Sequence, residues 1–392
     1  MSSMEVVECL DKYQKLELIH YGKFASVCFG KLKNRPHPAT VAIKQNFRFG
    51  LAEIRAYKDL KNCDKILKVF DICDNYKTIV LELCMSSLYE LLGCQSLCLP
   101  QQKNVIHQFL NALEAIHSKN FVHRDVKSAN LLMTFDGVLK IADLEGMLEN
   151  NVNMANFKAG TPGFTPPEVL ISTSTLAVNI SMDLWSAGIT LFEILTNVSK
   201  DLIDHVKMSE IRSITNVFGC VAGPYLSSLP GYEEYYEWAK FYEERNLADT
   251  LRLLMAENTQ AEMDIIEKLL KVEPSERASV SQLLESDFFS VEPLPSADLT
   301  EAIEGFMRNQ NIERPPPHDE PELNWDNIVL PDEEPLSPPH DDTPSNDDTF
   351  LDWKNIVLQI KAYSVLIPME KKRKTKNSIC EGLGFKKLSI VT

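Results

Sequence analysis

Long hydrophobic runs are missing from this sequence of 392 residues. No stretch approaches the roughly 18 consecutive apolar residues that a membrane-spanning helix needs. The first residues, MSSMEVVECLDKYQ, contain neither a basic leader followed by an apolar stretch nor a small-residue cleavage site. We therefore expect a chain with no membrane partner and no export signal.

Paired cysteines and a basic surface are missing as well. The nine cysteines are scattered, and the closest two, Cys94 and Cys98, lack a second pair or nearby histidine to complete a zinc site. We interpret them as reduced thiols of a protein of the nucleus or cytoplasm. The formal charge is −16, of which −12 falls on residues 313–352, while residues 353–392 carry +7. The remaining −11 on residues 1–312 does not indicate a nucleic-acid partner.

What is present is an apolar content of 44%, enough for a substantial core, in two different patterns. Residues 13–85 alternate short apolar runs with Gly, Asn and Pro breaks, which predicts a small, mostly antiparallel sheet. One helix-like segment, near Leu51 to Lys61, interrupts it. From about Asn104 to Phe289 apolar residues recur every three or four positions, which predicts helices.

The composition changes after about Ser290. The following sequence, which includes ERPPPHDEPELNWDNIVLPDEEPLSPPHDDTPSNDD, is proline-rich, acidic and poor in residues that form a core. Such segments do not bury enough apolar surface to fold alone. We predict that residues 291–392 form a mostly disordered tail.

One string carries chemistry. Residues 123–130 read H-R-D-V-K-S-A-N, and Asp143 follows Asn130 after thirteen positions, at the end of the apolar run 139–142. This pattern resembles the catalytic loop H-R-D-x-K-x-x-N of the eukaryotic protein kinases. The resemblance implies an α+β fold of two lobes, with a kinase domain at residues 13–290 divided into an N-lobe (about 13–84) and a C-lobe (about 85–290).

The same resemblance assigns roles to the side chains of this string. Asp125 is expected to orient the acceptor hydroxyl and take its proton as the catalytic base, and Lys127 to steady the γ-phosphate of ATP. Asn130 and Asp143 are expected to hold Mg²⁺, which prefers hard oxygen ligands. ATP and Mg²⁺ are the implied cofactors, and protein substrates are the implied partners.

Further strings follow in the order that the family shows. V-A-I-K at residues 41–44 matches the strand whose lysine grips the α- and β-phosphates, and Glu53 matches its helix partner. G-T-P-G-F-T-P-P-E at residues 160–168 resembles the end of the activation segment, and Arg277 is the expected buried partner of Glu168. The nucleotide site implied by the resemblance consists of Ile19, Gly22, Val27, Ala42, Lys44, Glu53, Leu81, Glu82, Cys84 and Leu132.

The branch of the family is indicated by two residues. Lys127, two places after Asp125, and Thr161 resemble the serine/threonine branch. Residues 209–214 and 229–232 are faintly similar to cyclin-dependent and related kinases. However, Thr165 replaces an arginine of those relatives, and residues 48–52 do not resemble their cyclin-binding helix. Cyclin dependence and proline-directed specificity are therefore not supported.

Several positions depart from the family pattern. Of the three glycines in G-x-G-x-x-G-x-V, only Gly22 remains in residues 20–27, so we expect weaker nucleotide binding. Lys44 and Glu53 are only nine residues apart, and the alternative to an ion pair is that Glu53 is a solvated helix charge.

The turn I-A-D-L-E-G at residues 141–146 has Glu145 where the family has glycine. Its carboxylate would either repel the phosphates or join the metal's ligands, and the sequence does not decide between them. Because residues 144–160 contain no Ser, Thr or Tyr, we also hypothesise that Arg124 is satisfied by Glu145, by Glu149 or by a partner protein, without phosphorylation.

The tail contains two related hexamers. Trp325–Leu330, W-D-N-I-V-L, recurs as Trp353–Leu358, W-K-N-I-V-L, which suggests docking motifs or a segment that folds back on the kinase. The alternative is coincidence within a disordered segment. The basic block at residues 371–376 is a candidate for nuclear import or a solvated charge run.

Two functions follow from these observations. The first is an active serine/threonine protein kinase that uses Mg-ATP and carries a regulatory or docking tail. The second is a pseudokinase, a scaffold that binds partners and in some cases ATP without transferring phosphate. Every side chain with a direct chemical role is present, which favours activity, because positioned charge carries most of this catalysis.

Overall fold

The computed structural model describes residues 9–22, 25–33, 40–47, 50–154, 160–197, 211, 214–215, 220–242, 251–252, 255, 258–295, 298–315, 321 and 323–330. The second hexamer, Trp353–Leu358, and the basic block at residues 371–376 lie outside them. None of the helices within the described part has both the length and the apolarity of a membrane crossing.

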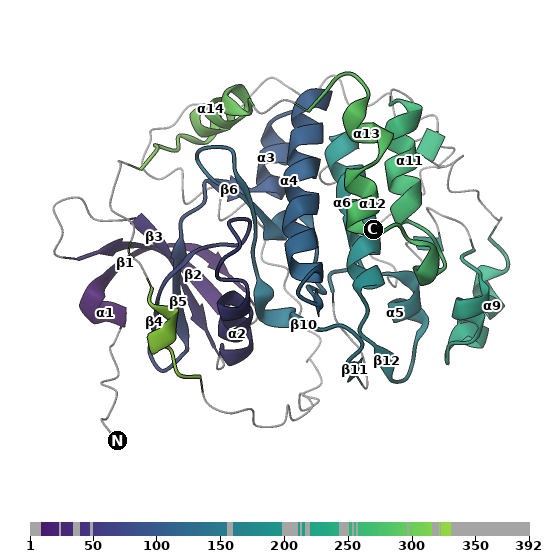
Figure 1. Cartoon of the computed structure of the whole chain (residues 1–392), viewed down its shortest axis with the longest axis horizontal. Coiled ribbons are helices and arrows are strands. Elements are labelled where there is room, and N and C mark those ends of the chain that lie inside the picture. Colours follow the sequence, from purple (N-terminus) through teal and green to yellow (C-terminus); the bar gives the residue numbers. More distant parts are fainter. Residues whose placement is uncertain are drawn as a thin grey trace, which may run out of the picture. The chain divides into compact units, whose positions relative to one another are not determined.

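The first part of the chain is a sheet of five antiparallel strands in the order β1-β2-β3-β5-β4 (Figure 1). The strands are β1 Tyr13–Tyr21, β2 Ala25–Leu32, β3 Thr40–Asn46, β4 Val69–Cys73 and β5 Thr78–Glu82. A short helix, α1 Cys9–Lys12, precedes the sheet, and α2 Leu51–Asp59 lies between β3 and β4. The predicted sheet with one inserted helix is confirmed.

The second part is mainly helical. Its helices are α3 Leu88–Cys94, α4 Leu99–His117, α5 Pro167–Ile171, α6 Ile180–Thr196, α8 Pro224–Ser227, α9 Tyr232–Ala239, α11 Gln260–Leu269, α12 Val280–Leu284 and α13 Asp287–Ser290. Short strands accompany them: β6 Ser86–Ser87, β7 Phe121–Val122, β8 Leu131–Met133, β9 Leu139–Ile141, β10 Leu148–Glu149, β11 Asn153–Met154 and β12 Leu176–Ala177. The predicted two-lobed α+β fold is therefore confirmed.

Two helices of this lobe are the scaffold for the loops that follow. The side chains of α4 that recur every three or four residues, Val105, Phe109, Leu113 and Ile116, are all fully buried. In α6 buried residues occur on every side of the helix, from Ser181 to Leu195. A helix that is buried all round belongs in the centre of a domain, and α6 contacts α4 and α11.

The antiparallel pair β8 and β9 carries the residues of the predicted catalytic site. Leu131 pairs with Ile141, and the N–H of Ala142 donates to the carbonyl of Asn130 at 2.9 Å. Asn130 and Asp143 are thereby brought to the same end of this hairpin. The 3-10 turns η1 Ser128–Asn130 and η2 Leu144–Gly146 flank it, and η2 contacts α2.

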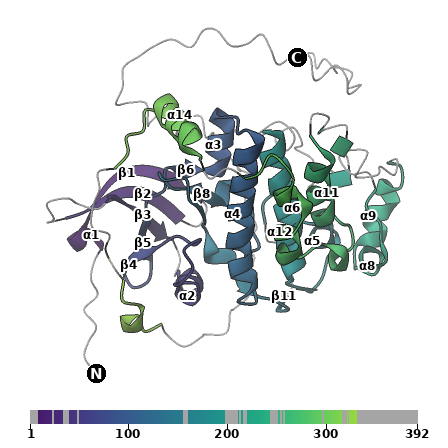
Figure 2. The same cartoon turned by 45° about the horizontal axis from the view of Figure 1, so that its top comes forward.

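The predicted tail contributes two folded pieces. Helix α14 Thr300–Gln310 buries Ala302, Ile303 and Phe306 and lies against α3 (Figure 2). Residues 323–330, with the 3-10 turn η4 Trp325–Asn327, pack by their apolar side chains against the main core. The proline-rich and acidic composition of the tail did not indicate these contacts, because the residues that the tail packs against are distant in the sequence.

Candidate active site

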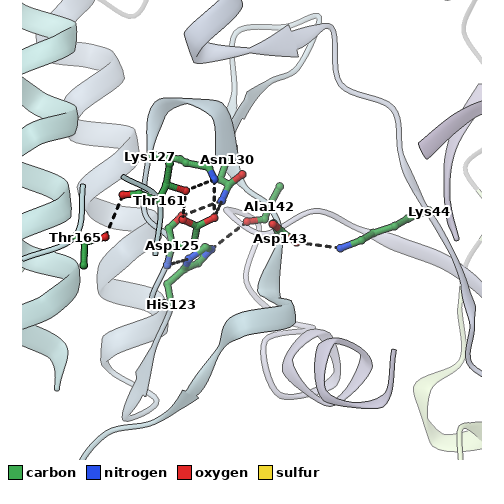
Figure 3. Close-up of polar contacts among 9 residues, drawn as sticks. All are labelled: Lys44, His123, Asp125, Lys127, Asn130, Ala142, Asp143, Thr161 and Thr165. Carbon is green, nitrogen blue, oxygen red and sulfur yellow. Dashed lines mark hydrogen bonds and ion pairs between the residues drawn. The ribbon is translucent and has the colours of Figure 1, made fainter. Parts of the chain in front are cut away.

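The carboxylate of Asp125 is surrounded by polar side chains (Figure 3). Lys127 Nζ donates to its Oδ2 at 2.7 Å, and Asn130 Nδ2 donates to the same oxygen at 3.0 Å. The hydroxyl of Thr161 donates to its Oδ1 at 2.6 Å and accepts from Lys127 Nζ at 2.6 Å. The structure therefore brings together the three predicted catalytic-loop side chains and presents a threonine hydroxyl to the predicted base.

A buried carboxylate fixes the backbone of the catalytic loop. Asp183, in α6 and fully buried, accepts from the N–H groups of His123 at 2.7 Å and Arg124 at 2.8 Å, and contacts His117 Nε2 at 2.9 Å. Burial raises the pKa of Asp183, but the hydrogen bonds and neighbouring imidazoles lower it to below its ordinary value. Arg124 has a φ of 73°, which is unfavourable for a residue with a side chain, so the loop needs these bonds.

His123 links the loop to the turn after β9. Its Nε2 lies 3.0 Å from the carbonyl of Ala142, and its Nδ1 lies 3.3 Å from the N–H of Asp125. Since a carbonyl needs a donor and an N–H needs an acceptor, the partners assign a neutral ring with its proton on Nε2. This ring ties the position of Asp125 to that of Asp143.

Lys44 joins the two lobes. Its Nζ lies 2.7 Å from Glu53 Oε1 in α2 and 3.0 Å from Asp143 Oδ1. Glu53 is fully buried, so the alternative of a solvated helix charge is wrong. Burial lowers the pKa of Lys44, but the two carboxylates raise it, and the net shift is upward, so the ammonium stays charged. Burial raises the pKa of Asp143 and the Lys44 charge lowers it, with a net downward shift.

Asn130 and Asp143 have the oxygens that Mg²⁺ prefers. Asp143 is in the left-handed conformation at φ 63°, which aspartate tolerates better than most residues, and its side chain is 45% exposed. Asn130 uses its amide nitrogen on Asp125, which leaves its Oδ1 on the opposite side of the group. Within the described residues no three His, Cys, Asp or Glu side chains cluster as metal ligands, so further ligands would be phosphate oxygens and water.

The predicted nucleotide-site residues lie on the sheet and on β8. Ile19 and Val27, in β1 and β2, are half-buried, and Ala42 pairs with Leu81 between β3 and β5. Ala42, Cys84 and Leu132 are half-buried apolar side chains packed against the main core, as the walls of an adenine site would be. These residues come from five strands, β1, β2, β3, β5 and β8, and from the segment after β5.

Glu82 differs from its apolar neighbours in this set. Its side chain is occupied by Lys140 Nζ at 2.9 Å and by the N–H of Lys68 at 2.6 Å. A nucleotide contact from Glu82 would therefore be made by its backbone. The thiol of Cys84 has a raised pKa because it is buried, and Glu82 adds to the shift.

The turn after β1 retains Gly22 for a steric reason. The N–H of Gly22 donates to the carbonyl of Ala25 at 2.9 Å, and a Cβ at Gly22 would lie 2.8 Å from His20 Nε2. The His20 ring thus packs against Gly22. Burial lowers the pKa of His20, while the charge of Asp143 raises it, and the net shift is downward. The next two residues of this loop, 23–24, are outside the described part.

The turn that holds Glu145 is anchored through its backbone. Arg124 Nη1 donates to the carbonyl of Gly146 at 2.9 Å, while the side chains of Glu145 and Glu149 are exposed. Burial lowers the pKa of Arg124, and the charge of Asp183 raises it, with a net downward shift. The arginine of the catalytic loop is therefore tied to the turn beside Glu145 by a bond to the main chain.

A buried ion pair closes the activation segment. Arg277 donates to both oxygens of Glu168, at 2.6 and 2.8 Å, and also to the carbonyl of Ser181 at 2.8 Å. Its guanidinium lies 5.2 Å from the ring centre of Trp185. The predicted pairing of Arg277 with Glu168 is confirmed.

Two contributors were not predicted. Thr161 was chosen only as a sign of the serine/threonine branch, although its hydroxyl touches both Asp125 and Lys127. Asp183 holds the catalytic loop through two main-chain hydrogen bonds and is not among the predicted site residues. The buried position of an aspartate near the start of an apolar helix was the available signal, because a carboxylate there must have partners.

This fold and this constellation of charges define a protein kinase domain, and comparison with known proteins agrees. A model of the family described as protein kinase domain matches residues 13–289. The chain is 29% identical over 325 residues to cyclin-dependent kinase 9 of Homo sapiens and 30% identical to that of Bos taurus, covering 74% of this chain and 85% of each relative.

Solved structures show the same fold. A chain in the structure of the CAK complex from Chaetomium thermophilum bound to ATP-γ-S matches with a TM-score of 0.60 and 21% identity, covering 73% of this chain and 93% of that one. A chain of the yeast RNA Pol II CTD kinase CTDK-1 complex matches with a TM-score of 0.62 and 23% identity, covering 76% and 98%. The chain belongs to the eukaryotic serine/threonine protein kinases related to the cyclin-dependent kinases.

Proposed function

We propose that this chain is an active serine/threonine protein kinase that transfers the γ-phosphoryl group of ATP to protein hydroxyls, with Asp125 as the catalytic base. The observation that carries the proposal is the contact of Asp125 with a hydroxyl. Thr161 Oγ1 lies 2.6 Å from Asp125 Oδ1, within the range from which a base takes a proton. An acceptor hydroxyl entering beside Thr161 would meet the same carboxylate.

The surrounding charges suit the rest of the reaction. Lys127 Nζ, 2.7 Å from Asp125 Oδ2, would neutralise charge on the transferred group. Lys44 keeps its charge through Glu53 and Asp143 and would grip the inner phosphates. Mg²⁺, when bound by Asn130 and Asp143, would supply the positive charge that neutralises the developing charge on the phosphates. Phosphoryl transfer needs little from the protein beyond such positioned charge.

The adenine would lie between the sheet and β8. Ala42, Cys84 and Leu132 offer half-buried apolar surfaces there, and Leu81 closes the inner end. ATP sites are mostly apolar with a few polar groups that fix orientation. The bound ATP analogue of the Chaetomium thermophilum complex belongs to a protein of the same fold.

A pocket beside Asp125 would receive the acceptor peptide. It is lined by Thr161 and by the apolar side chains of Phe164, Pro166, Val169 and Met182. Thr165, where related kinases carry arginine, also lines it.

The alternative, a pseudokinase scaffold, rests on the turn after β1. The His20 ring packs against Gly22, where the family has glycine at both positions. A ring in this place would compete with the phosphates for space. The scaffold reading therefore predicts weak or absent nucleotide binding, or binding without transfer.

The proposed partners and location of the chain are those that the sequence predicts. We propose that the chain acts without a cyclin, because the surface of α2 already binds residues 323–330 of the same chain through Lys58 and Lys61. The nucleus or cytoplasm is the proposed location, with the basic block at residues 371–376 as a nuclear import candidate.

The test is phosphoryl transfer by the purified full-length chain, alone, with γ-labelled ATP, Mg²⁺ and generic protein substrates. We expect label on serine and threonine, and a loss of about 10²- to 10⁴-fold in Asp125→Asn. Nucleotide binding is measured in parallel by thermal shift. Binding without any transfer would replace the kinase by the scaffold, and transfer only after addition of a cyclin would overturn the partner proposal.

A further inference from the structure

Residues 323–330 of the tail lie beside α2 and β4 in both views of the chain, as the yellow-green segment (Figures 1 and 2). Lys58 Nζ donates to the carbonyl of Ile328 at 2.9 Å, and the hydroxyl of Tyr76 donates to the carbonyl of Val329 at 2.6 Å. Lys61 Nζ lies 3.8 Å from Asp326 Oδ1. We call the surface formed by Lys58, Lys61 and Tyr76 the tail-docking surface.

The segment has an inner and an outer side. Leu323, Trp325 and Leu330 are packed against the main core, and Ile328 is half-buried. On the outer side Val329 is 69% exposed and the Asp326 side chain is 87% exposed. Binding of this segment therefore depends on four apolar side chains and on two backbone carbonyls. The carbonyls are present in any sequence, so the apolar side chains determine which segment binds.

The second hexamer fits the same description when it is extended by two residues. The first segment reads L-N-W-D-N-I-V-L at 323–330, and the second reads L-D-W-K-N-I-V-L at 351–358. All four inward positions are identical. The two differences fall at positions 324 and 326, both of which are exposed in the first segment.

The first difference preserves a local bond. The side chain of Asn324 accepts from the N–H of Asp326 at 3.0 Å and so begins the 3-10 turn. Asp352, at the equivalent place, has the same type of acceptor, and aspartate favours such turns as well as asparagine does. The second segment therefore carries an acceptor side chain of the kind that this turn uses.

The second difference changes a charge. Asp326 faces Lys61, whereas the equivalent residue of the second segment is Lys354. An exposed ion pair contributes little, and the like-charge contact opposes binding by a similar amount. The second segment should bind the same surface with an affinity that is lower by a small factor.

We propose that the tail-docking surface recognises both segments, and that Leu351–Leu358 of the same chain replaces residues 323–330 on it. The twenty residues between the segments, 331–350, are long enough to allow this, since an extended chain of that length spans about 65 Å. Lys58 of this surface belongs to α2, the helix that also carries Glu53.

The proposal is tested by fluorine NMR of the full chain labelled with 5-fluorotryptophan. The four tryptophans, Trp185, Trp238, Trp325 and Trp353, are assigned by single Trp→Phe variants. In the wild type we expect Trp325 in its bound position. In Trp325→Ala we expect the Trp353 resonance to move to the bound position, because the surface is vacant. Trp238→Phe is the matched control and should leave the Trp353 resonance unchanged.

Charge variants make the test independent of Trp325. In Asp326→Lys the two segments carry the same charge, and the bound fraction of Trp353 should rise about two- to fivefold. In the double variant Asp326→Lys with Lys61→Glu, both segments place a lysine opposite Glu, so both should exchange on the surface. In Lys61→Glu alone only the second segment has this lysine, so the bound fraction of Trp353 should rise. Thermal unfolding verifies that each variant is folded.

Two results would overturn the proposal. One is a Trp353 resonance that stays the same in folded Trp325→Ala, Asp326→Lys and Lys61→Glu, which would mean that the surface is specific for the first segment. The other is a shift that depends on protein concentration over an approximately tenfold range, which would assign the second segment to another copy of the chain.

Discussion

The catalytic loop, residues 123–130, and the turn at residues 20–22 are built differently. In the loop Asp125, Lys127 and Asn130 bond to one another, and Asp183 holds the main chain. In the turn one hydrogen bond from Gly22 and a packed His20 ring replace a glycine-rich backbone.

The difference indicates which part of kinase chemistry this chain depends on. The loop determines the position of charge, which contributes most to phosphoryl transfer. The turn determines how closely a backbone approaches the phosphates, which affects nucleotide affinity. If the chain is an enzyme, changes behind the loop should have much larger effects than changes in the turn.

The largest effect is expected from Asp183→Asn. Asparagine replaces one of the two acceptor oxygens by an NH2 donor, which would face a main-chain N–H donor, and it removes a buried charge. We expect the free energy of unfolding to fall by about 3 to 5 kcal/mol and kcat/KM to fall about 100-fold, because the loop shifts. Urea unfolding and phosphoryl transfer measure these. Asp264→Asn, an exposed aspartate of α11, is the control, and equal effects in both variants would contradict the role of Asp183.

A smaller effect, dependent on pH, is expected behind the same loop. Glu193 of α6 is buried, and burial raises its pKa to about 7, while a hydrogen bond with Ser128 of the catalytic loop opposes the shift. Its Oε2 has no hydrogen-bond partner among the described residues. The protonated form is therefore the one that the folded loop accommodates.

The sign of the effect follows from the raised pKa. The favourable contribution is fully present below the unfolded value of 4.5 and is lost as the pH rises through about 7. Glu193→Gln should remove this dependence and stabilise the chain at pH 8 by up to roughly 3 kcal/mol, at about 1.4 kcal/mol for each pKa unit. Urea unfolding from pH 5 to pH 8 measures it. Parallel pH profiles of variant and wild type would exclude Glu193 as the source.

The turn should respond more weakly. His20→Gly restores a glycine and removes the ring that packs on Gly22, so we expect the KM for ATP to fall about three- to fivefold with kcat almost unchanged. Leu16→Gly, at an exposed position of the same strand, controls for the flexibility that glycine introduces. A rise in KM would show that the His20 ring itself binds nucleotide, and would reverse the comparison between loop and turn.

Much of this architecture could be predicted from local patterns. Short apolar runs predicted the sheet, helical spacing predicted α4 and α6, and the catalytic strings fixed the order of the site residues. The Lys44–Glu53 ion pair was implied by the resemblance to the kinase family, with a solvated Glu53 as the alternative, and the structure shows the pair. These features depend on residues close in sequence or on strings with a chemical reason for their spacing.

The features that could not be predicted depend on contacts across the chain. The bond from Tyr76 to Val329 joins residues 253 positions apart, and nothing in the acidic setting of the tail indicated its receiving surface. The bond between Thr161 and Asp125 depends on the path of the activation segment. In both cases the sequence shows the residue type, but the residue that it contacts is determined by the tertiary fold.

The smallest effect is expected at Glu145, in the 3-10 turn η2 that follows β9. Its side chain is exposed, and the carbonyl of the next residue, Gly146, accepts from Arg124 Nη1 at 2.9 Å. An exposed carboxylate is screened by water, so Glu145→Gly should change phosphoryl transfer by no more than about twofold, or raise it slightly. Steady-state kinetics at two salt concentrations measure this, with Glu149→Gly as the matched exposed control. If transfer is instead abolished only in Glu145→Gly, the carboxylate has been recruited to the metal or to Arg124, and the loop's set of charges includes one that the family lacks.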